Sequence, residues 1–198
     1  MTVDQTAVLL VHLQPDIVEA DGAFGGVFAA EAARCRIIES TDDFARAARA
    51  VGVTVVFLRI AFADDSSDLE ANMPLLQLVT DMGALKDGTA AADIVSAIAI
   101  DESDIVLTHV RPGPFTASAL HEELAQRGIT SVAVAGVATN ASVEATVRQA
   151  ADLGYHCTVL DDLCSAADPA AHEASLASMA LFATVSESSR FLEALAPA

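Results

Sequence analysis

The chain is poor in basic side chains. Of its 198 residues only 10 are Lys or Arg, against 28 Asp or Glu, and the formal net charge is −18. Binding to nucleic acid requires clustered Lys and Arg to neutralise phosphates, and anionic membrane surfaces attract the same groups. The composition therefore argues against nucleic acid and membrane surfaces as partners. The acidic residues are scattered, which is typical of a solubilising surface.

Long apolar runs and a targeting segment are also missing. The longest clean runs, residues 7–11 and 131–137, are far shorter than the roughly 20 residues of a membrane span. The N-terminal segment MTVDQTAV has no basic region before an apolar stretch, so no signal peptide is expected. Cys35, Cys157 and Cys164 form no close-spaced metal motif. An odd number of cysteines without a secretion signal is typical of reduced thiols, and we expect a cytoplasmic protein.

The motifs of several enzyme classes are absent. No G-x-S-x-G elbow occurs, no G-x-G-x-x-G follows a predicted strand, and the glycine-rich segment DGAFGG (residues 21–26) lacks a following Lys. No H-x-H, D-x-H or H-E-x-x-H is present. We therefore expect neither a metal nor a cofactor. A metal site built by His12, Asp16 and His109 from separate strands stays open as an alternative that spacing does not support.

Segments of strand and helix character alternate along the chain, in which hydrophobic residues make up 53%. Strands that are apolar along their whole length indicate a sheet covered on both faces, and strand–helix alternation indicates parallel order with right-handed crossovers. We predict one α/β domain over residues 1–198, a three-layer doubly wound fold with a six-stranded parallel sheet and helices on both faces. Strands are expected at residues 7–13, 53–60, 104–108, 131–137, 155–160 and 183–185. Helices are expected at residues 29–51, 74–82, 90–98, 117–127, 140–153, 169–181 and 186–195.

Three polar residues at predicted strand ends are candidate catalytic residues. His12 ends the first strand, His109 directly follows the third, and Ser142 lies in the first turn of the helix after the fourth. Ligands in such sheets bind beyond the carboxyl ends of the strands. A hydroxyl nucleophile needs a base, an imidazole can supply one, and a helix start offers N–H groups to an oxyanion. Each residue also has an ordinary structural explanation, since Ser is common at helix starts.

Other polar residues near predicted strand ends have different assignments. Arg59 and Arg111 follow strands and could bind an anionic group. Asp161 and Asp162 are expected to end the fifth strand. The remaining histidines are expected to have no role in the site: two lie on predicted helices near the surface and one begins a strand at the far end. These are His121, His172 and His156.

Four segments resemble one known family. The opening strand AVLLVHLQPDIV is similar to the usual L-L-V-I-D-M-Q-N-D-F, and VAVAGVATNASVEATVRQAADLGY matches G-V-x-T-x-x-C-V-x-x-T-x-x-x-A-x-x-x-G-Y. LTHVRPGPF resembles the segment that carries the family's lysine, and VLDDLCSA resembles the next strand end. The chain thus resembles, from Ala7 to about Leu195, the isochorismatase-like hydrolases or cysteine hydrolases, which include nicotinamidases, N-carbamoylsarcosine amidases and isochorismatases.

The resemblance implies a site whose residues have all been replaced. The family's triad is Asp, Lys and Cys, and these positions fall on His12, His109 and Ser142, so thiolate chemistry is not available here. The D-x-H metal loop of nicotinamidases is missing from residues 61–68. The family also commonly has a cis peptide at the bond corresponding to Val137–Ala138. Its members usually form dimers or tetramers, so a homodimer or homotetramer is expected.

Two classes of function follow. The first is a hydrolase of a small amide, ester or vinyl ether, in which Ser142 attacks with an imidazole as base, or His12 acts as an acid without a nucleophile. Asp16 is a candidate to orient the base, and backbone N–H groups near Ala141 and Ser142 to hold the oxyanion. The second is a non-catalytic protein that binds a small metabolite or an oligomer partner. The expected substrate-binding residues are Gln14, Arg111, Phe115, Val137, Ala138, Thr139 and Ala141.

Overall fold

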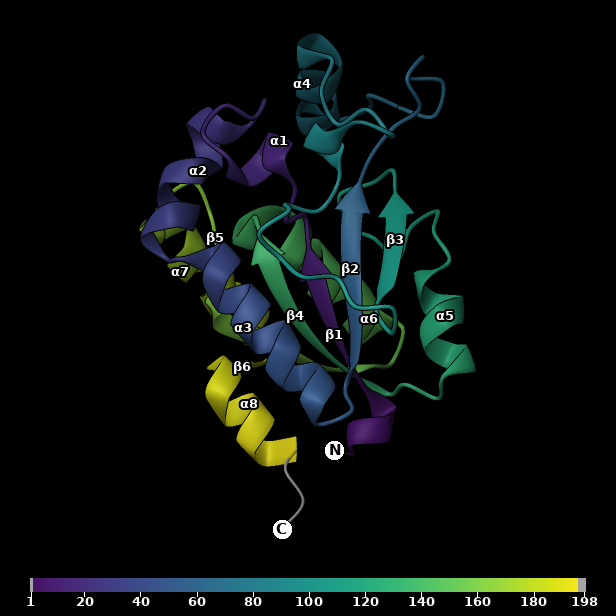
Figure 1. The fold of residues 1–198 in the computed structure, drawn as a ribbon, viewed down its shortest axis with the longest axis vertical. Helices are drawn as coiled ribbons and strands as arrows, with labels where there is room; N and C mark the ends of the chain where they lie inside the picture. The colour runs from purple at the N-terminus through teal and green to yellow at the C-terminus, as the bar shows by residue number, and fades with distance from the viewer. Residues whose placement is uncertain (1, 196–198) are drawn as a thin grey trace.

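The computed structural model of the protein describes residues 2–195, which form a parallel sheet between layers of helix (Figure 1). Six strands lie in the order β3-β2-β1-β4-β5-β6, and every neighbouring pair is parallel. The order reverses beside β1, as in doubly wound sheets. The strands are β1 (Thr6–Val11), β2 (Thr54–Ile60), β3 (Ile105–His109), β4 (Ser131–Val137), β5 (His156–Ser165) and β6 (Thr184–Ser186).

Helices cover both faces of this sheet, so the predicted three-layer α/β class is confirmed. In Figure 1, α3 and α8 lie in front of the sheet and α6 and α7 lie behind it, while α1, α2 and α4 gather near the carboxyl ends of the strands. The α-helices are α1 (Pro15–Val18), α2 (Gly25–Arg34), α3 (Ile37–Ala50), α4 (Pro74–Met82), α5 (Leu120–Gln126), α6 (Glu144–Asp152), α7 (Pro169–Met179) and α8 (Ser188–Leu195). The shorter turns are η1 (Val3–Gln5), η2 (Ala90–Ala92) and the π-helical η3 (Thr139–Val143).

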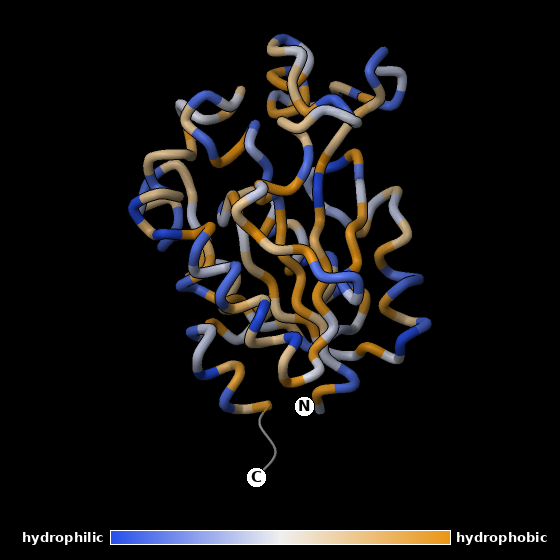
Figure 2. Tube along the Cα trace, in the orientation of Figure 1, coloured by the Kyte–Doolittle hydropathy of each residue, from blue (hydrophilic) through white to orange (hydrophobic). Residues whose placement is uncertain are grey.

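The core is centred on β1 and β4. Every residue of these two strands is buried, because each strand has a neighbour on both sides and helices above and below. Figure 2 shows this as a hydrophobic band through the middle of the sheet. A fully buried pair of central strands gives the polar groups at their carboxyl ends a fixed position, which is what an active site needs.

The helices predicted over residues 29–51 and 90–98 differ from the structure. The helix expected over residues 29–51 is two helices, because Arg36 adopts a left-handed conformation (φ 53°) that separates α2 from α3. The helix expected over residues 90–98 is only the turn η2, since Val95 N–H donates to Leu13 O, two residues after β1 (2.9 Å), instead of to a carbonyl of its own segment. The periodicity of apolar residues does not reveal a left-handed residue or a backbone hydrogen bond to a distant segment.

The fifth strand is longer than predicted. It was expected over residues 155–160 but extends to Ser165, with a shift in register against β4: Val134 lies opposite Val159, whereas Gly136 lies opposite Cys164. Asp161 therefore lies within the irregular middle of β5 and not at its carboxyl end. The acidic pair expected at the strand end is displaced from the functional edge of the sheet.

No helix among residues 2–195 has the length and apolar character needed to cross a bilayer. The cysteines at positions 35, 157 and 164 are free thiols. Burial raises the pKa of Cys157 to about 11 and that of Cys164 to about 12, so both thiols stay protonated at neutral pH. Neither of these two thiols is available as a nucleophile in place of the family's cysteine.

Candidate active site

Two buried histidines meet at the carboxyl ends of β1 and β3. His12 directly follows β1 in a left-handed conformation (φ 56°), and His109 is the last residue of β3. Their Nε2 atoms lie 3.1 Å apart, and the rings stack with centroids 5.0 Å apart. Because β2 separates β1 from β3 in the sheet, the left-handed turn after β1 is what brings the two rings together. His is among the residues that tolerate this conformation.

The hydrogen bonds fix the tautomers of this histidine pair. His109 Nδ1 lies 2.7 Å from Arg111 O, and a carbonyl oxygen only accepts, so Nδ1 carries the proton. His109 Nε2 is then an acceptor, and His12 Nε2–H must donate to it. The proton of the neutral His12 ring is thereby on Nε2. His12 Nδ1 is left as the unprotonated nitrogen of the pair.

Both imidazoles are neutral at physiological pH. Burial lowers the pKa of His109 to about 4, partly offset by its bond to Arg111 O. The pKa of His12 is held well below its ordinary value, first by burial and then by repulsion from His109. Desolvation penalises the imidazolium form, and a second imidazolium 3 Å away would add like-charge repulsion. The pair is a potential base and carries no positive charge of its own.

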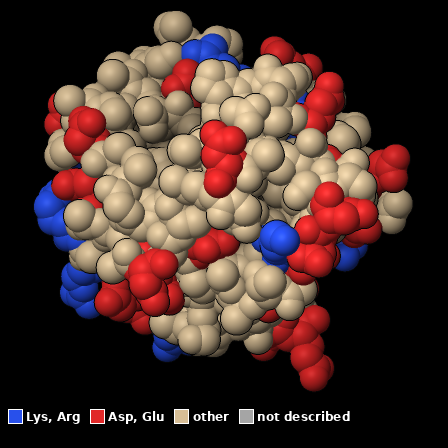
Figure 3. All heavy atoms as spheres, turned by 90° about the horizontal axis from the view of Figure 1, so that it is seen from above, with Lys and Arg blue, Asp and Glu red and all other residues tan. Residues whose placement is uncertain are grey.

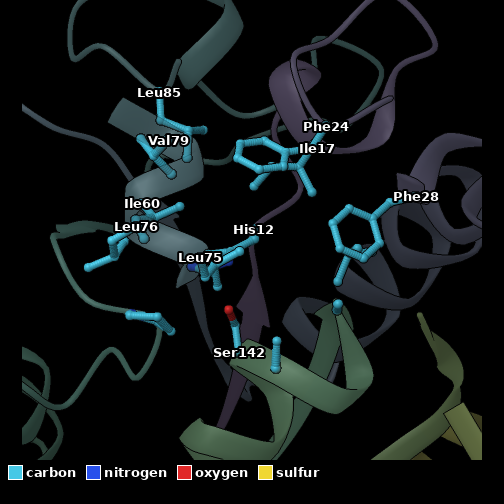
Figure 4. A pocket seen from close by; sticks show the side chains of 14 residues that line it. His12, Ile17, Phe24, Phe28, Ile60, Leu75, Leu76, Val79, Leu85 and Ser142 are labelled. Atoms are coloured by element: carbon cyan, nitrogen blue, oxygen red, sulfur yellow. The ribbon is translucent and has the colours of Figure 1, made fainter. Parts of the chain in front are cut away.

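Ser142 lies across from His12, on the turn that follows β4. The peptide bond Val137–Ala138 is cis, and the next residues form the π-helical turn η3, in which Val143 N–H donates to Ala138 O (3.1 Å). Single π-helical turns occur frequently at functional sites. Figure 4 shows the Ser142 hydroxyl pointing into a cavity that His12 also borders. Within residues 2–195, Ser142 Oγ makes no hydrogen bond.

The cavity between these two residues is small and apolar. Its volume is about 50 Å³. Figure 4 shows aliphatic and aromatic side chains around it, with only His12 and Ser142 offering polar groups. Its walls come from the turns after β1 and β4, from α1 and α2, and from α4. The lining residues are His12, Ile17, Phe24, Phe28, Ile60, Leu75, Leu76, Val79, Leu85, Pro112, Val137, Ala138, Ala141 and Ser142.

Two predicted substrate-binding residues are engaged elsewhere. The fully buried Gln14 side chain donates to Ile60 O (2.9 Å) and Ala92 O (2.8 Å) and accepts from Ile60 N–H, so both of its amide N–H groups are used. Arg111 donates to Glu70 O and to the Asn72 side chain, and does not line the cavity. Both side chains bond the loops around the site, and their role as substrate ligands stays a prediction.

Two further predicted residues also lie outside the cavity. Phe115 packs against Tyr155, with ring centroids 5.8 Å apart. Thr139 is fully buried, and its hydroxyl bonds His172 Nδ1 (2.9 Å), whose Nε2 in turn donates to Asp161 (2.9 Å). This chain of contacts ties the η3 turn to α7 and β5. His172, expected at the surface, is therefore partly buried and structural.

Two proposed helpers of catalysis have other partners. The Asp16 carboxylate accepts N–H bonds from Leu85 (2.8 Å) and Ala23 (3.4 Å), so it anchors loops and does not orient an imidazole. Ala141 N–H donates to Ala138 O (3.1 Å) inside η3 and is not free for an oxyanion. In the part of the chain that the structure describes, no three His, Cys, Asp or Glu side chains are arranged to hold a metal ion.

The hydrophobic wall of the cavity is not marked by any sequence motif. Phe24 and Phe28 come from the glycine-rich loop and α2, and Leu75, Leu76 and Val79 come from α4. Apolar residues at helical spacing read as ordinary core, so periodicity alone does not mark them as lining a site. The signal that could have found them is the position of α4, a short apolar helix in an otherwise irregular connection after β2.

Comparison with known proteins gives one family. The model of the isochorismatase domain matches residues 6–190. Among solved structures, an isochorismatase family protein from Desulfovibrio vulgaris superposes with a TM-score of 0.84 at 24% identity, covering 98% of this chain and 99% of that one. At this level of identity the likeness concerns the fold.

Curated relatives include both an enzyme and a protein named as inactive. The ureidoacrylate amidohydrolase of Cronobacter turicensis is 29% identical over 211 residues, covering 98% of this chain and 90% of its own. A probable inactive nicotinamidase of Arabidopsis thaliana is 28% identical over 176 residues, covering 88% and 87%. The site of this chain therefore has to be judged on its own residues.

Proposed function

Because this chain belongs to the isochorismatase family, whose domain model matches residues 6–190, we propose that it is a hydrolase of a small ester or amide with His12, His109 and Ser142 as its machinery. One observation carries the proposal. His12 Nδ1 and Ser142 Oγ both belong to cavity-lining residues, and neither atom is hydrogen-bonded or sealed from solvent within residues 2–195. A base and a hydroxyl that make no other hydrogen bond, on two residues lining one cavity, are the minimum for acyl transfer.

The reaction would proceed through an acyl-enzyme. Ser142 Oγ attacks the substrate carbonyl carbon and its proton passes to His12 Nδ1. The tetrahedral intermediate collapses, and the same proton goes to the leaving alcohol or amine. Water then enters, gives a proton to His12 Nδ1 and attacks the acyl carbon. The C–Oγ bond breaks, Ser142 Oγ takes the proton back from His12, and the carboxylic acid leaves. Bonds between serine and base are often long before substrate binds and tighten only in the complex.

His109 would support the charge that forms on His12. When His12 takes a proton it becomes an imidazolium whose Nε2–H already donates to His109 Nε2. A charge-assisted hydrogen bond is shorter and stronger than a neutral one. The Nδ1–H bond from His109 to Arg111 O holds this acceptor in the correct tautomer. His109 would thus orient His12 as the aspartate orients the histidine in a Ser-His-Asp triad, although His109 is a neutral imidazole and not a carboxylate.

A non-catalytic binding protein is the second candidate. It is favoured by the missing hydrogen bond between Ser142 and either imidazole and by the apolar cavity wall. The same cavity would then hold a small metabolite without converting it. We also propose a cytoplasmic homodimer or homotetramer, supported by apolar side chains exposed beside the edge strand β6, among them Leu181 at 83% exposure.

The test is hydrolysis of short-chain esters and amides by the wild type and by Ser142→Ala and His12→Asn. Asn is chosen because it tolerates the left-handed backbone at position 12. The exposed Ser189→Ala and His156→Asn serve as matched controls. We expect the wild type and both control variants to hydrolyse at least one substrate at similar rates. Both site variants should be slower by at least about 100-fold. Turnover that survives Ser142→Ala would remove the covalent step, and a folded protein without turnover on any substrate would favour the binding protein.

A further inference from the structure

The cavity beside Ser142 presents no charge to a ligand. Of its lining residues within the described part of the chain, none is Lys, Arg, Asp or Glu, and all but His12 and Ser142 are apolar (Figure 4). The aromatic rings of Phe24 and Phe28 form one side, and Leu75 and Val79 of α4 form another. A carboxylate entering such a space loses its water and gains no ionic partner, which is strongly unfavourable.

The basic side chains near the carboxyl ends of the strands already bond other protein groups. Arg111 donates to Glu70 O (3.0 Å) and Asn72 Oδ1 (2.7 Å). Arg59 donates to Asp87 (2.7 Å), and its side chain is 18% exposed. Lys86 lies 3.0 Å from Asp64. None of the three cations lines the cavity, so recruiting one for a ligand would break contacts that hold the loops covering the site.

The histidine pair does not supply the missing positive charge. Burial and mutual repulsion lower the pKa of both imidazoles, so they are neutral at neutral pH. The rest of the chain also disfavours an anionic ligand, because its net charge is −18. Figure 3 views the molecule from the end where the strands have their carboxyl termini, and acidic side chains are spread across that face. This field lowers the local concentration of anions.

We infer that the cavity selects short, uncharged acyl compounds and rejects those that carry a carboxylate. The inference rests on the proposed function for the site but concerns its ligand class. It separates this chain from ureidoacrylate, the substrate that names one of its relatives, because that compound bears a carboxylate. The small volume, about 50 Å³, further favours an acyl group of only a few carbons.

Binding is tested separately from turnover with a matched pair of amides. Butanamide and succinamate have the same carbon chain next to the amide, and differ in a terminal methyl group against a terminal carboxylate. Each is titrated into the protein while backbone amide shifts are followed by NMR. We expect butanamide to shift the signals of Ser142 and Ala141 and to bind at least about tenfold more tightly than succinamate, since the apolar wall favours only the methyl group.

A charge placed in the wall should reverse this preference. Leu75 lines the cavity and is only partly buried, so Leu75→Arg can be accommodated with little cost to folding. Leu78 lies on the same helix, is 37% exposed and does not line the cavity, so Leu78→Arg is the matched control. We expect Leu75→Arg to bind succinamate more tightly than butanamide, and Leu78→Arg to behave as the wild type. A reversal by both variants would assign the effect to net charge and contradict the inference.

The outcomes separate ligand class from catalysis. Turnover is measured on methyl butanoate and monomethyl succinate, the corresponding esters. Butanamide binding at the cavity without ester turnover would uphold the ligand class and contradict the hydrolase. Faster turnover of monomethyl succinate, or tighter binding of succinamate by the wild type, would overturn the ligand class and leave the hydrolase standing. Failure of both amides to bind a folded protein would also overturn it.

Discussion

At the scale of single residues, the site differs from that of a cysteine hydrolase in charge as well as in nucleophile. A carboxylate and an ammonium group would form an ion pair, whereas His12 and His109 form a neutral hydrogen-bonded pair with fixed tautomers. A neutral pair buried in apolar surroundings avoids the desolvation penalty of two ions. It can still accept a proton at His12 Nδ1. The replacements are therefore chemically compatible with each other.

The low pKa values of this pair predict the pH profile. A base works in its neutral form, and the pKa of His12 is lowered by burial and by His109. We therefore expect kcat/KM for methyl butanoate to be level from about pH 8 down to the ordinary imidazole pKa of about 6.5, and to fall only at lower pH. Rates measured between about pH 4 and 8 check this. An acidic limb at or above 6.5 would show that the base is solvated and not the buried imidazole.

At the scale of elements, the site depends on how closely β1 and β4 approach each other. Gly136 has a φ of 124°, and a Cβ atom built there would lie 2.1 Å from Val11 O. Only glycine permits both this conformation and this contact. The residue directly precedes Val137, whose cis bond to Ala138 starts the turn that carries Ser142. This glycine therefore allows the turn that carries Ser142 to lie against the end of β1, which His12 follows.

Gly136→Ala should destabilise the protein by about 3 kcal/mol, because backbone atoms must move to relieve the contact. Gly26→Ala is the matched control: it lies on α2, and a Cβ there meets nothing within 4 Å. Alanine within a helix should leave stability unchanged or raise it by up to about 1 kcal/mol. Urea unfolding of both variants provides the comparison. Equal stability of Gly136→Ala and the wild type would contradict the role given to this glycine.

For the whole molecule, two features surround the site: the helix α4, which covers the cavity, and the negative charge of the chain. The α4 helix closes the cavity from above the strands, and loops held by Gln14, Asp16 and Arg111 fix its position. The large negative charge then surrounds an uncharged interior.

Folding stability should fall as the pH is lowered from about 6.5 to about 4. In this range the unfolded chain protonates His109, whereas the folded chain, with a pKa of about 4, does not. The loss of stability caused by His109 is absent at pH values above its pKa in the unfolded chain, about 6.5. It reaches about 3 kcal/mol near its pKa in the folded chain. His109→Gln, compared with the wild type by urea unfolding at each pH, should show a shallower loss. Parallel curves for the two proteins would exclude this linkage.

The class of the fold follows from the hydrophobic pattern of the chain alone. Apolar strands separated by amphipathic helices have few stable arrangements other than a parallel sheet covered on both faces, and that arrangement places His12, His109 and Ser142 at one edge. The local pattern of apolar and polar residues is enough to predict the bounds of an element when those bounds depend only on neighbouring residues. The bounds of α4 and β4 are accordingly those expected.

Which of those edge residues line the cavity depends on long-range packing. Gln14, Arg111 and Thr139 lie beside the site in sequence, but long-range hydrogen bonds turn their side chains to other segments. The tautomers of the histidines, and the wall supplied by α4, likewise depend on contacts between segments far apart in the chain. Sequence spacing carries no information about such contacts, because they are set by how the elements pack and not by their periodicity.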